Sequence, residues 1–575
     1  MTSDRETPHS LDLPQVLDVE NPFTFARGLR IAGFLAAVLA IAVMWLGDRY
    51  SWLNYQPGGT AFFNYVRPVF YVMLAVGALV AIKWQVAGGV IGGFAAGAIG
   101  AITVNQLIGR HAALVIALLV VPSGLWVLSD LLGWSRRSAA IGVVGVLAAT
   151  TVGAILGELV YERQFGPTHP ASDTAALPDS ALRWVWSGGT TTTHVEVRAK
   201  TRSDQVEQLR LAVAPTPEFS EAETRFFDAE ARDGRIVTFD ADGLEAGQTY
   251  YYGVEVNGEV DAVRTGSFST FADNQSSFRF TVGACARVGS NGSVFDAILA
   301  EDPLFHMIAG DFHYGDIPDD TRDRYDEVID LTLRQPAQAA LYRSVPIAYV
   351  WDDHDYGAND SNFSSPSRVA AMQAYRANVP SYELAGDLSA IYQAFDVGRV
   401  RFLLTDARSA REPGVTMLGG EQLEWFLDEL VEAADEQALV VWVNPVPWIA
   451  EESSGADHWG GFADERRGIA DVIADNEIDN LLMISADAHM VAIDDGTNTD
   501  YSSSGGGGFP LLHAAALDRP GSTKGGPYSE GEQGGSGQYG VVDVDDTGDT
   551  ISVGLAAKRF DGDTVIAYDF EIAAD

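Results

Sequence analysis

Cysteine and lysine are both scarce in this chain of 575 residues. The single cysteine, Cys285, excludes an intrachain disulfide. Only four of the 37 basic residues are lysines, and they are Lys83, Lys200, Lys524 and Lys558. With 79 acidic residues the formal net charge is −42, and such a field repels the phosphates of nucleic acids. We therefore expect no stable nucleic-acid complex.

The start of the chain shows no signal-peptide pattern, and residues 1–27 read as a polar cytoplasmic N-terminus. The acidic residues are scattered rather than gathered in a tail, and aromatic residues are plentiful, which excludes a wholly disordered chain. Scattered acid with little lysine is typical of adaptation to high salt, although an ordinary acidic protein is the alternative. A phosphate-processing enzyme with this charge would need local cations, most simply metal ions.

Five apolar stretches lie between residues 28 and 161, near 30–47, 68–82, 86–107, 112–132 and 138–160. Four of them are about long enough to cross a bilayer as a helix, and the third and fifth are rich in glycine, as in helices packed closely in lipid. We predict a transmembrane domain of five helices rather than a buried helical soluble domain. The distribution of arginine and lysine favours, slightly, a cytoplasmic N-terminus, and five crossings then place the C-terminal part outside the cell.

Residues 162–181 read as a linker, and residues 182–271 contain short alternating segments typical of a β-sandwich. The segment 244–252 resembles the corner before a late strand of a fibronectin type III-like domain. In such a corner a tyrosine hydroxyl bonds to the backbone.

Residues 272–575 alternate between strand and helix patterns, which predicts a mixed α/β domain with antiparallel strands late in the chain. We expect strands at 278–284, 304–309, 347–351, 391–397, 400–405, 438–444, 481–486, 540–544 and 550–556. We expect helices at 293–301, 320–334, 366–379, 420–435 and 464–476. Two loops rich in glycine and serine, 502–508 and 519–537, are expected to form rims or lids.

Potential metal ligands follow four of the predicted strands. They are Cys285; Asp311 and Tyr314; the run from Asp352 to Asp355 with Asn359; and Asp487 with His489. Such side chains can converge at one edge of a sheet, and their mixed oxygen, nitrogen and sulfur donors suit a trivalent or borderline metal beside a hard divalent one. For the acidic run alone, a solvated turn is the alternative.

At these residues the chain resembles the alkaline phosphatase D (PhoD-like) family of calcineurin-like metallophosphoesterases. The family's cysteine after the first strand matches Cys285, and its Gly-Asp-x-x-Tyr matches Gly310, Asp311 and Tyr314. The remaining matches are Trp351, Asp352, Asp353, His354, Asp355 and Asn359; Asp487 and His489; residues 404–408 with Arg411; and residues 420–425. The resemblance covers about residues 182–575, and the membrane domain is not part of the family pattern. Ala486 and Asp355 depart from the family's usual glycine and glutamate.

The resemblance implies a layered metallophosphatase domain behind the sandwich, with an iron(III) site and one or more calcium ions. Five residues would hold iron, and they are Cys285, Asp311, Tyr314, Asp487 and His489. Asp353 and Asn359 would help to bind calcium or a bridging oxygen. His354 would contact the phosphoryl group or protonate the leaving group, and Arg408 would contact phosphate or form an ion pair with Asp406.

Other residues receive structural interpretations. Asp352 is expected to act as a supporting or capping acid, and His306 and His313 as packing or loop residues. Asn444 is a doubtful ligand, and His458 is a weaker candidate for lining the site. Cys285 would be an inert core residue if it stood alone.

The sequence therefore predicts a membrane-anchored phosphoesterase that hydrolyses phosphate mono- or diesters outside the cell with metal-activated hydroxide. A monoesterase resembling purple acid phosphatases is one alternative, although Cys285 stands where those enzymes have an aspartate. A non-catalytic membrane sensor that has kept the fold is another.

Overall fold

The computed structural model describes residues 28–40, 61–104, 121–126, 128, 136–165, 170–203, 208–386, 389–519 and 523–573. The chain divides into two compact units, Met1–Tyr161 and Glu162–Asp575. Each unit is described by itself.

The described part of the first unit is helical. It contains α2 (Ala61–Ala81), α3 (Gln85–Val104) and the start of α5 (Arg136–Phe165), with further helical residues at 28–40 and 121–126. A β-carbon on Gly97 or Gly153 would collide with the backbone of the facing helix, so α3 and α5 approach closely because these residues are glycine. The sequence predicts close packing of the glycine-rich third and fifth apolar stretches, and α3 and α5 pack in this way.

One helical segment among the described residues, Gly142–Val160, is both long and apolar enough to cross a membrane. The apolar segments Gly28–Ala40, Val69–Ala81 and Gln85–Ala101 are shorter. The predicted N-terminus at 1–27 and most of the stretch at 112–132 lie outside the described residues. A bundle of five membrane-spanning helices is therefore not supported by the part of the chain that the structure describes.

The second unit begins with a β-sandwich. Its first sheet contains β1 (Leu182–Gly188), β2 (Val195–Thr201), β5 (Ala231–Asp233) and β6 (Ile236–Ala241). Its second sheet contains β3 (Leu209–Ala214), β4 (Arg225–Asp228), β7 (Thr249–Val256), β8 (Glu259–Val260) and β9 (Gly266–Ser269). The amide of Glu245 donates to the hydroxyl of Tyr250 at 3.1 Å, which confirms the tyrosine corner.

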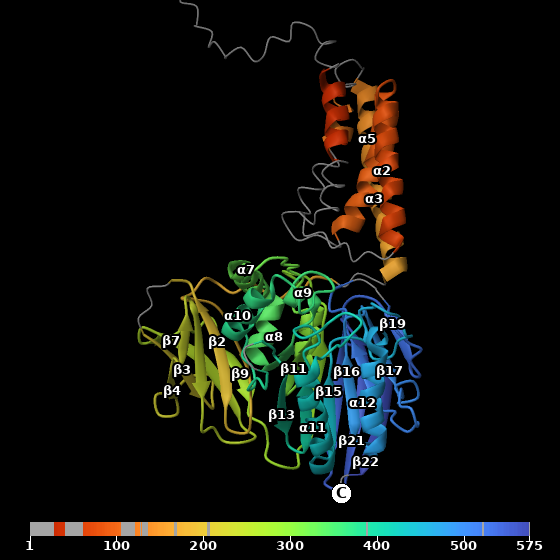
Figure 1. Ribbon diagram of the computed structural model, residues 1–575. Coiled ribbons are helices and arrows are strands. Elements are labelled where there is room, and N and C mark those ends of the chain that lie inside the picture. The colour runs from red at the N-terminus through yellow and green to blue at the C-terminus, as the bar shows by residue number, and fades with distance from the viewer. Residues whose placement is uncertain are drawn as a thin grey trace, which may run out of the picture. The chain divides into compact units, whose positions relative to one another are not determined.

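The first sheet of the sandwich continues into the α/β part of the unit. β1 pairs in parallel with β12 (Ile347–Val350), so the sheet gains β11 (Phe305–Ala309) and β10 (Phe278–Gly283). It then ends with β20 (Gln538–Asp546), β21 (Thr550–Arg559) and β22 (Thr564–Ala573), giving ten strands in all. The ten-stranded sheet therefore contains strands from both sides of the expected domain boundary at residue 271 (Figure 1). β1, β2, β5 and β6 precede this residue in the chain, and the other six strands follow it.

A seven-stranded sheet packs against the ten-stranded one. Its strands are β13 (Gln393–Val397), β14 (Val400–Leu404), β15 (Leu439–Val443), β16 (Leu481–Ser485), β18 (Leu511–Ala514), β17 (Met490–Asp494) and β19 (Gly531–Gly534). The two sheets meet through phenylalanine rings, with centroids 5.3 Å apart for Phe280 and Phe402 and 5.7 Å apart for Phe305 and Phe395.

Helices cover the outer faces of the two large sheets. A buried apolar cluster joins α11 (Gly420–Glu436) and α12 (Ala463–Asp475) to the seven-stranded sheet, with Trp442, Trp448 and Trp459 among its members. On the ten-stranded sheet, α8 (Pro336–Ser344) packs Tyr342 against Trp186 of β1. The other helices are α6 (Val294–Ala300), α7 (Arg322–Thr332), α9 (Asp353–Tyr356) and α10 (Arg368–Asn378), with a 3-10 turn at Trp459–Phe462. The layered mixed α/β fold is confirmed.

Candidate metal centre

Two runs of parallel strands bring the candidate residues together. β10, β11 and β12 are parallel neighbours in one sheet, and β14, β15 and β16 are parallel neighbours in the other. The carboxyl ends of parallel neighbours lie at one edge, where loops carry reactive groups. Cys285, Asp311, Asp353 and Asp487 each come two or three residues after β10, β11, β12 and β16.

Three of these residues meet around one thiol. The Cys285 Sγ lies 3.5 Å from Asp311 Oδ2 and 3.7 Å from the carbonyl oxygen of Asp487. All three have left-handed backbones, with φ of 61° for Cys285, 52° for Asp311 and 66° for Asp487. This conformation is uncommon for residues other than glycine and gathers at functional sites. The strand ends thus turn sharply and direct thiol and carboxylate together.

A phenol and an imidazole form the next contact. The hydroxyl of Tyr314 lies 3.0 Å from Nε2 of His489. The Tyr314 ring also packs against the ring of His354, with centroids 4.0 Å apart, and the guanidinium of Arg519 lies 4.4 Å from its centroid. Tyr314 is therefore held between both candidate histidines.

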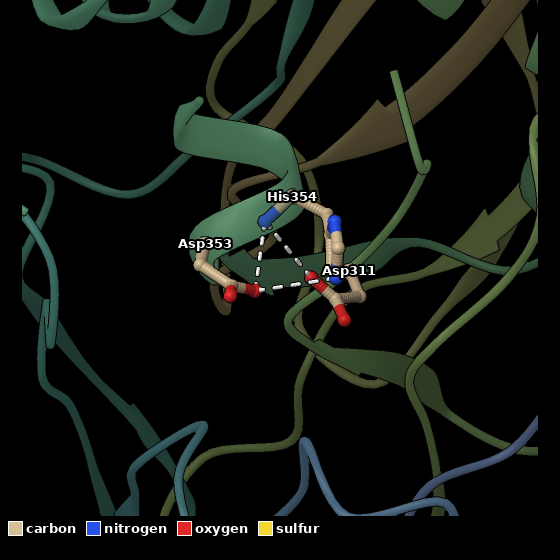
Figure 2. A group of neighbouring side chains, drawn as sticks. All are labelled: Asp311, Asp353 and His354. Carbon is tan, nitrogen blue, oxygen red and sulfur yellow. Dashed lines mark hydrogen bonds and ion pairs between the residues drawn. The ribbon is translucent and has the colours of Figure 1, made fainter. Parts of the chain in front are cut away.

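Asp311, Asp353 and His354 form a compact group (Figure 2). The backbone amide of His354 donates to Asp353 Oδ1 at 2.9 Å and to Asp311 Oδ1 at 3.3 Å. One side-chain atom from each of the three residues lies within 4.8 Å of the others, so the imidazole stands beside two carboxylates. The sequence predicted all three as site residues, and α9 places two of them.

A second group contains only carboxylates. Asp353, Asp360 and Asp457 also each offer one atom within 4.8 Å of the others. The backbone amide of Asp360 donates to Asp353 Oδ2 at 2.6 Å, which fixes the second oxygen of that carboxylate. Asn359, which the sequence assigns to the calcium site, is exposed and directly precedes Asp360. An all-oxygen set is the kind that calcium prefers.

Arg408 is not placed as expected. Its guanidinium is fully buried and donates through Nε to Asp352 at 2.5 Å and through its terminal nitrogens to Asp457 at 2.8 and 3.2 Å. The expected ion pair with Asp406 is wrong, since Asp406 instead accepts the backbone amide of Arg408 at 3.0 Å. Arg408 thus positions two carboxylates, and its donor fork is occupied by them.

Three further residues of these loops make supporting contacts. Asp355 accepts the amides of Asp352 at 3.1 Å and His313 at 3.0 Å, so it braces the loop. Asn444 accepts the indole N–H of Trp459 at 3.1 Å and donates to Thr405 Oγ1 at 2.8 Å, which engages it in the core. His458 caps the 3-10 turn by accepting the amide of Gly460.

Several buried acidic groups of the site have raised pKa values, which favours the binding of a cation. Burial raises the pKa of Asp311 to about 8 and that of Asp487 to about 6, and nearby carboxylates add to both shifts. Burial also raises the pKa of the Cys285 thiol and of the Tyr314 phenol well above their usual values. Without a cation Asp311, Cys285 and Tyr314 stay protonated near neutral pH, and a metal ion would deprotonate them by binding. The donor set therefore fits a metal centre.

His354 carries the opposite perturbation. Burial alone would lower its pKa, but the charges of Asp353 and Asp316 and the hydrogen bond from Nδ1 to Asp316 raise it well above its usual value. Its Nε2 lies 3.9 Å from Asp353 Oδ1. The imidazole is therefore held in the protonated form at the edge of the acidic groups, which suits proton donation.

Three neighbours of the site were not predicted from the sequence, and they are Asp316, Asp457 and Lys524; Asp360 belongs to the acidic loop after the strand at 347–351 but received no role of its own. Lys524 comes from the loop expected to act as a lid, and its Nζ donates to both oxygens of Asp487 at 2.9 and 3.1 Å. Lysine is rare in this chain, with four residues in all, and this rarity could have identified Lys524 as a candidate site residue. Asp316 and Asp457 have no such mark, because isolated acids are common throughout this chain.

The chain is similar to known proteins in sequence and in fold. Residues 280–515 match the family model described as PhoD-like phosphatase. Over 311 residues the chain is 23% identical to alkaline phosphatase D of Bacillus subtilis (strain 168), covering 44% of this chain and 53% of that protein. The chain thus spans about half the length of this curated relative. A solved structure described as "Structure of PhoD" superposes with a TM-score of 0.55 at 16% identity, over 70% of this chain and 92% of the other. These likenesses support the fold and the expected enzyme class, a phosphoric ester hydrolase.

Proposed function

We propose that the chain is a metal-dependent phosphoric ester hydrolase. The observation that carries the proposal is the convergence of Cys285, Asp311, Asp353 and Asp487 from four strand ends into one buried site. The match of residues 280–515 to the PhoD-like phosphatase family supports the same chemistry.

The residues divide between two kinds of metal site. The sulfur, phenol and imidazole donors of Cys285, Tyr314 and His489, with the carboxylates of Asp311 and Asp487, fit iron(III) as the resemblance implies. The carboxylates of Asp353, Asp360 and Asp457 suit calcium, with the exposed Asn359 as the remaining candidate from the sequence. When bound, such ions supply Lewis acidity and lower the pKa of a water that attacks phosphorus.

The protein's own groups complete the site. The protonated imidazole of His354 would donate to a phosphoryl oxygen or to the leaving group. Arg408 holds Asp352 and Asp457 apart from each other and in place. Lys524 neutralises Asp487 from the opposite loop and could release it when a cation binds.

We further propose that residues 28–161 anchor the chain in a membrane with residues 162–575 outside the cell. Apolar side chains on α5 support the anchor, since Val144, Leu147 and Val152 are each more than half exposed. Such an apolar surface is stable in lipid and costly in water. Phosphate monoesters or diesters outside the cell would then be the substrates.

The first experiment measures hydrolysis of a chromogenic phosphate monoester and diester by the full-length protein in detergent. The assay uses molar potassium chloride with calcium, because we propose that the acidic surface is adapted to high salt. Cys285→Ala and Asp353→Asn should each lower kcat/KM by about 100-fold or more. Mutating a residue that only hydrogen-bonds to a metal ligand already lowers metal affinity or activity by about 10–100-fold, and these two residues are themselves proposed ligands. The matched control is Asp428→Asn, an exposed acid on α11, which should match the parent protein.

Metal analysis and visible absorption accompany the assay. Loss of iron and of visible absorption in Cys285→Ala, with calcium loss in Asp353→Asn, would support the two assignments. Equal rates for all four proteins would contradict the hydrolase centre. A colourless, metal-free and inactive parent protein would favour the sensor alternative.

A further inference from the structure

Five arginines line a small cavity in the second unit. Its volume is about 130 Å³, and its lining includes Arg183, Arg202, Arg264, Arg334, Arg343 and Trp184. These residues come from the start of β1, the residue after β2, the turn before β9, the segment joining α7 to α8 and the last turn of α8. The cavity lies at the amino end of β1, which runs parallel to β12, whereas the metal centre follows the carboxyl end of β12. It is therefore a separate site.

The carboxylates around this cavity do not balance the arginines. Asp330 accepts two hydrogen bonds from Arg183, at 2.7 and 2.5 Å, and also pairs with Arg334 at 3.4 Å. Asp179 pairs with Arg202, but its side chain is 87% exposed, so that pair is well solvated. Asp330 and Asp179 thus pair with three of the five arginines, and Asp261 adds a third negative charge near Arg264, in a chain whose net charge is −42.

Arg264 and Arg343 supply the excess charge. The guanidinium of Arg264 donates to the carbonyls of Arg183 and Pro178, both at 3.0 Å, and to the hydroxyl of Ser180, all of which are neutral. Burial lowers the pKa of Arg264, and the charges of Arg202 and Arg343 add to this effect, while Asp261 partly opposes it; burial also lowers the pKa of Arg343. Cations that are buried or half-buried without a directly paired carboxylate are costly, so an anion here would relieve that cost.

Unpaired donors surround the same cavity. The indole Nε1 of Trp184 and the Nε atoms of Arg202 and Arg343 are buried without a hydrogen-bond partner among the described residues. Trp184 itself is only 2% exposed. The unpaired buried side-chain atoms of the cavity lining are all donors. Since buried polar groups are normally paired, this one-sided shortage points to an absent acceptor.

We propose that this arginine cavity binds a tetrahedral oxyanion of the phosphate class. Guanidinium forks match the geometry of such ions and can bind them through paired hydrogen bonds. A water needs about 10–15 Å³ of such space, so the cavity holds several waters or one small oxyanion but not a nucleotide. The ligand is therefore free phosphate or sulfate, bound at a distance from the hydrolytic centre.

The test measures binding of radiolabelled inorganic phosphate to the full-length protein in detergent. All proteins carry Asp353→Asn to weaken the hydrolytic centre, and that background alone is the reference. Adding Arg343→Gln or Arg202→Gln should weaken phosphate binding by about tenfold or more, because each removes one charged donor group. Arg467→Gln, a partly exposed arginine of α12 that pairs only with surface acids, is the matched control and should bind as the reference does.

Two further readouts separate a ligand site from a structural cluster. Phosphate or sulfate should raise the unfolding temperature of the reference protein, and the rise should be lost in both cavity variants. In the protein that keeps the native Asp353, Arg343→Gln and Arg202→Gln should leave ester hydrolysis unchanged. The phosphate-binding result does not depend on hydrolysis, so failure of the hydrolase proposal would not affect it. If both variants bind phosphate like the reference, or if neither anion shifts its unfolding temperature, the proposal is wrong. Should Arg343→Gln fail to fold, Arg202→Gln decides alone.

Discussion

Asp353 belongs to both groups of carboxylates in the candidate metal centre, one with Asp311 and His354 and one with Asp360 and Asp457. Its environment keeps it ionised: burial raises its pKa, but the charges of His354 and Arg408 outweigh burial and lower it. Asp311 shows the reverse balance, because burial dominates there. Two carboxylates a few ångströms apart are thus held in different states, as expected of a site built to receive cations.

A buried histidine outside the site makes stability depend on pH. Burial lowers the pKa of His306 to about 3, and its Nε2 has no partner among the described residues. Below the pKa of about 6.5 that this histidine has in the unfolded chain, the unfolded chain binds a proton and the folded chain does not. The free energy of unfolding therefore falls as pH falls. From about pH 7 to about pH 5 the loss should be about 2 kcal/mol. Chemical denaturation of the parent and of His306→Gln checks this, and the variant should lose less.

His194 provides a control of opposite sign. Burial opposes its protonation, but the hydrogen bond to Asp240 and neighbouring charges outweigh burial and raise its pKa. Its contribution is therefore present at low pH and is lost as pH rises through the folded pKa. His194→Gln should make the loss of stability on acidification larger than in the parent. An identical pH dependence in all three proteins would contradict the assignment.

At the scale of elements, most strands and helices of the α/β part could be predicted from periodicity. The strands at 278–284, 304–309 and 481–486 coincide with β10, β11 and β16 within a residue, because continuous apolar runs are typical of buried parallel strands. The elements missed were α8, α9, β17, β18, β19 and β22, together with the 3-10 turn at Trp459–Phe462, and β19 lies inside the loop expected at 519–537. β18 and α9 have only four residues each, which gives periodicity too little length to act on.

The joint between β1 and β12 depends on one glycine. A β-carbon at Gly188 would lie 2.6 Å from the carbonyl oxygen of Ile347 and 2.7 Å from that of Pro380. Gly188→Ala should therefore push these backbones apart and destabilise the second unit by about 1–3 kcal/mol, the usual cost of overpacking. Thermal and chemical unfolding would measure the effect.

Gly420 is the matched control for that substitution. It lies at the first position of α11, and a β-carbon there would meet nothing within 4 Å. Gly420→Ala should be neutral or slightly stabilising, since alanine favours a helix. Equal stability of the two variants would show that the sheet joint tolerates a side chain.

For the whole molecule, the proposed membrane anchor makes a prediction about fractionation. The full-length protein should stay with the membrane after alkaline carbonate extraction, because apolar helices such as Gly142–Val160 are stable in lipid. Protease added to intact cells should then cleave within residues 162–575 if that part faces outward. Release by carbonate would contradict the anchor, and protection in intact cells would contradict only the orientation.

The sequence by itself determined the layered α/β fold, the tyrosine corner and the strand ends that carry Cys285, Asp311, Asp353 and Asp487. It could do so because hydrophobic periodicity is local, and a ligand just after a strand is visible in one dimension. Only the tertiary structure decided that the sandwich shares a sheet with the α/β part, that Arg408 serves two carboxylates, and that Lys524 reaches Asp487. The arginine cavity is also a feature that only the tertiary structure decided. Its arginines come from segments that are distant in the sequence, so their excess over the nearby carboxylates arises only when the chain folds.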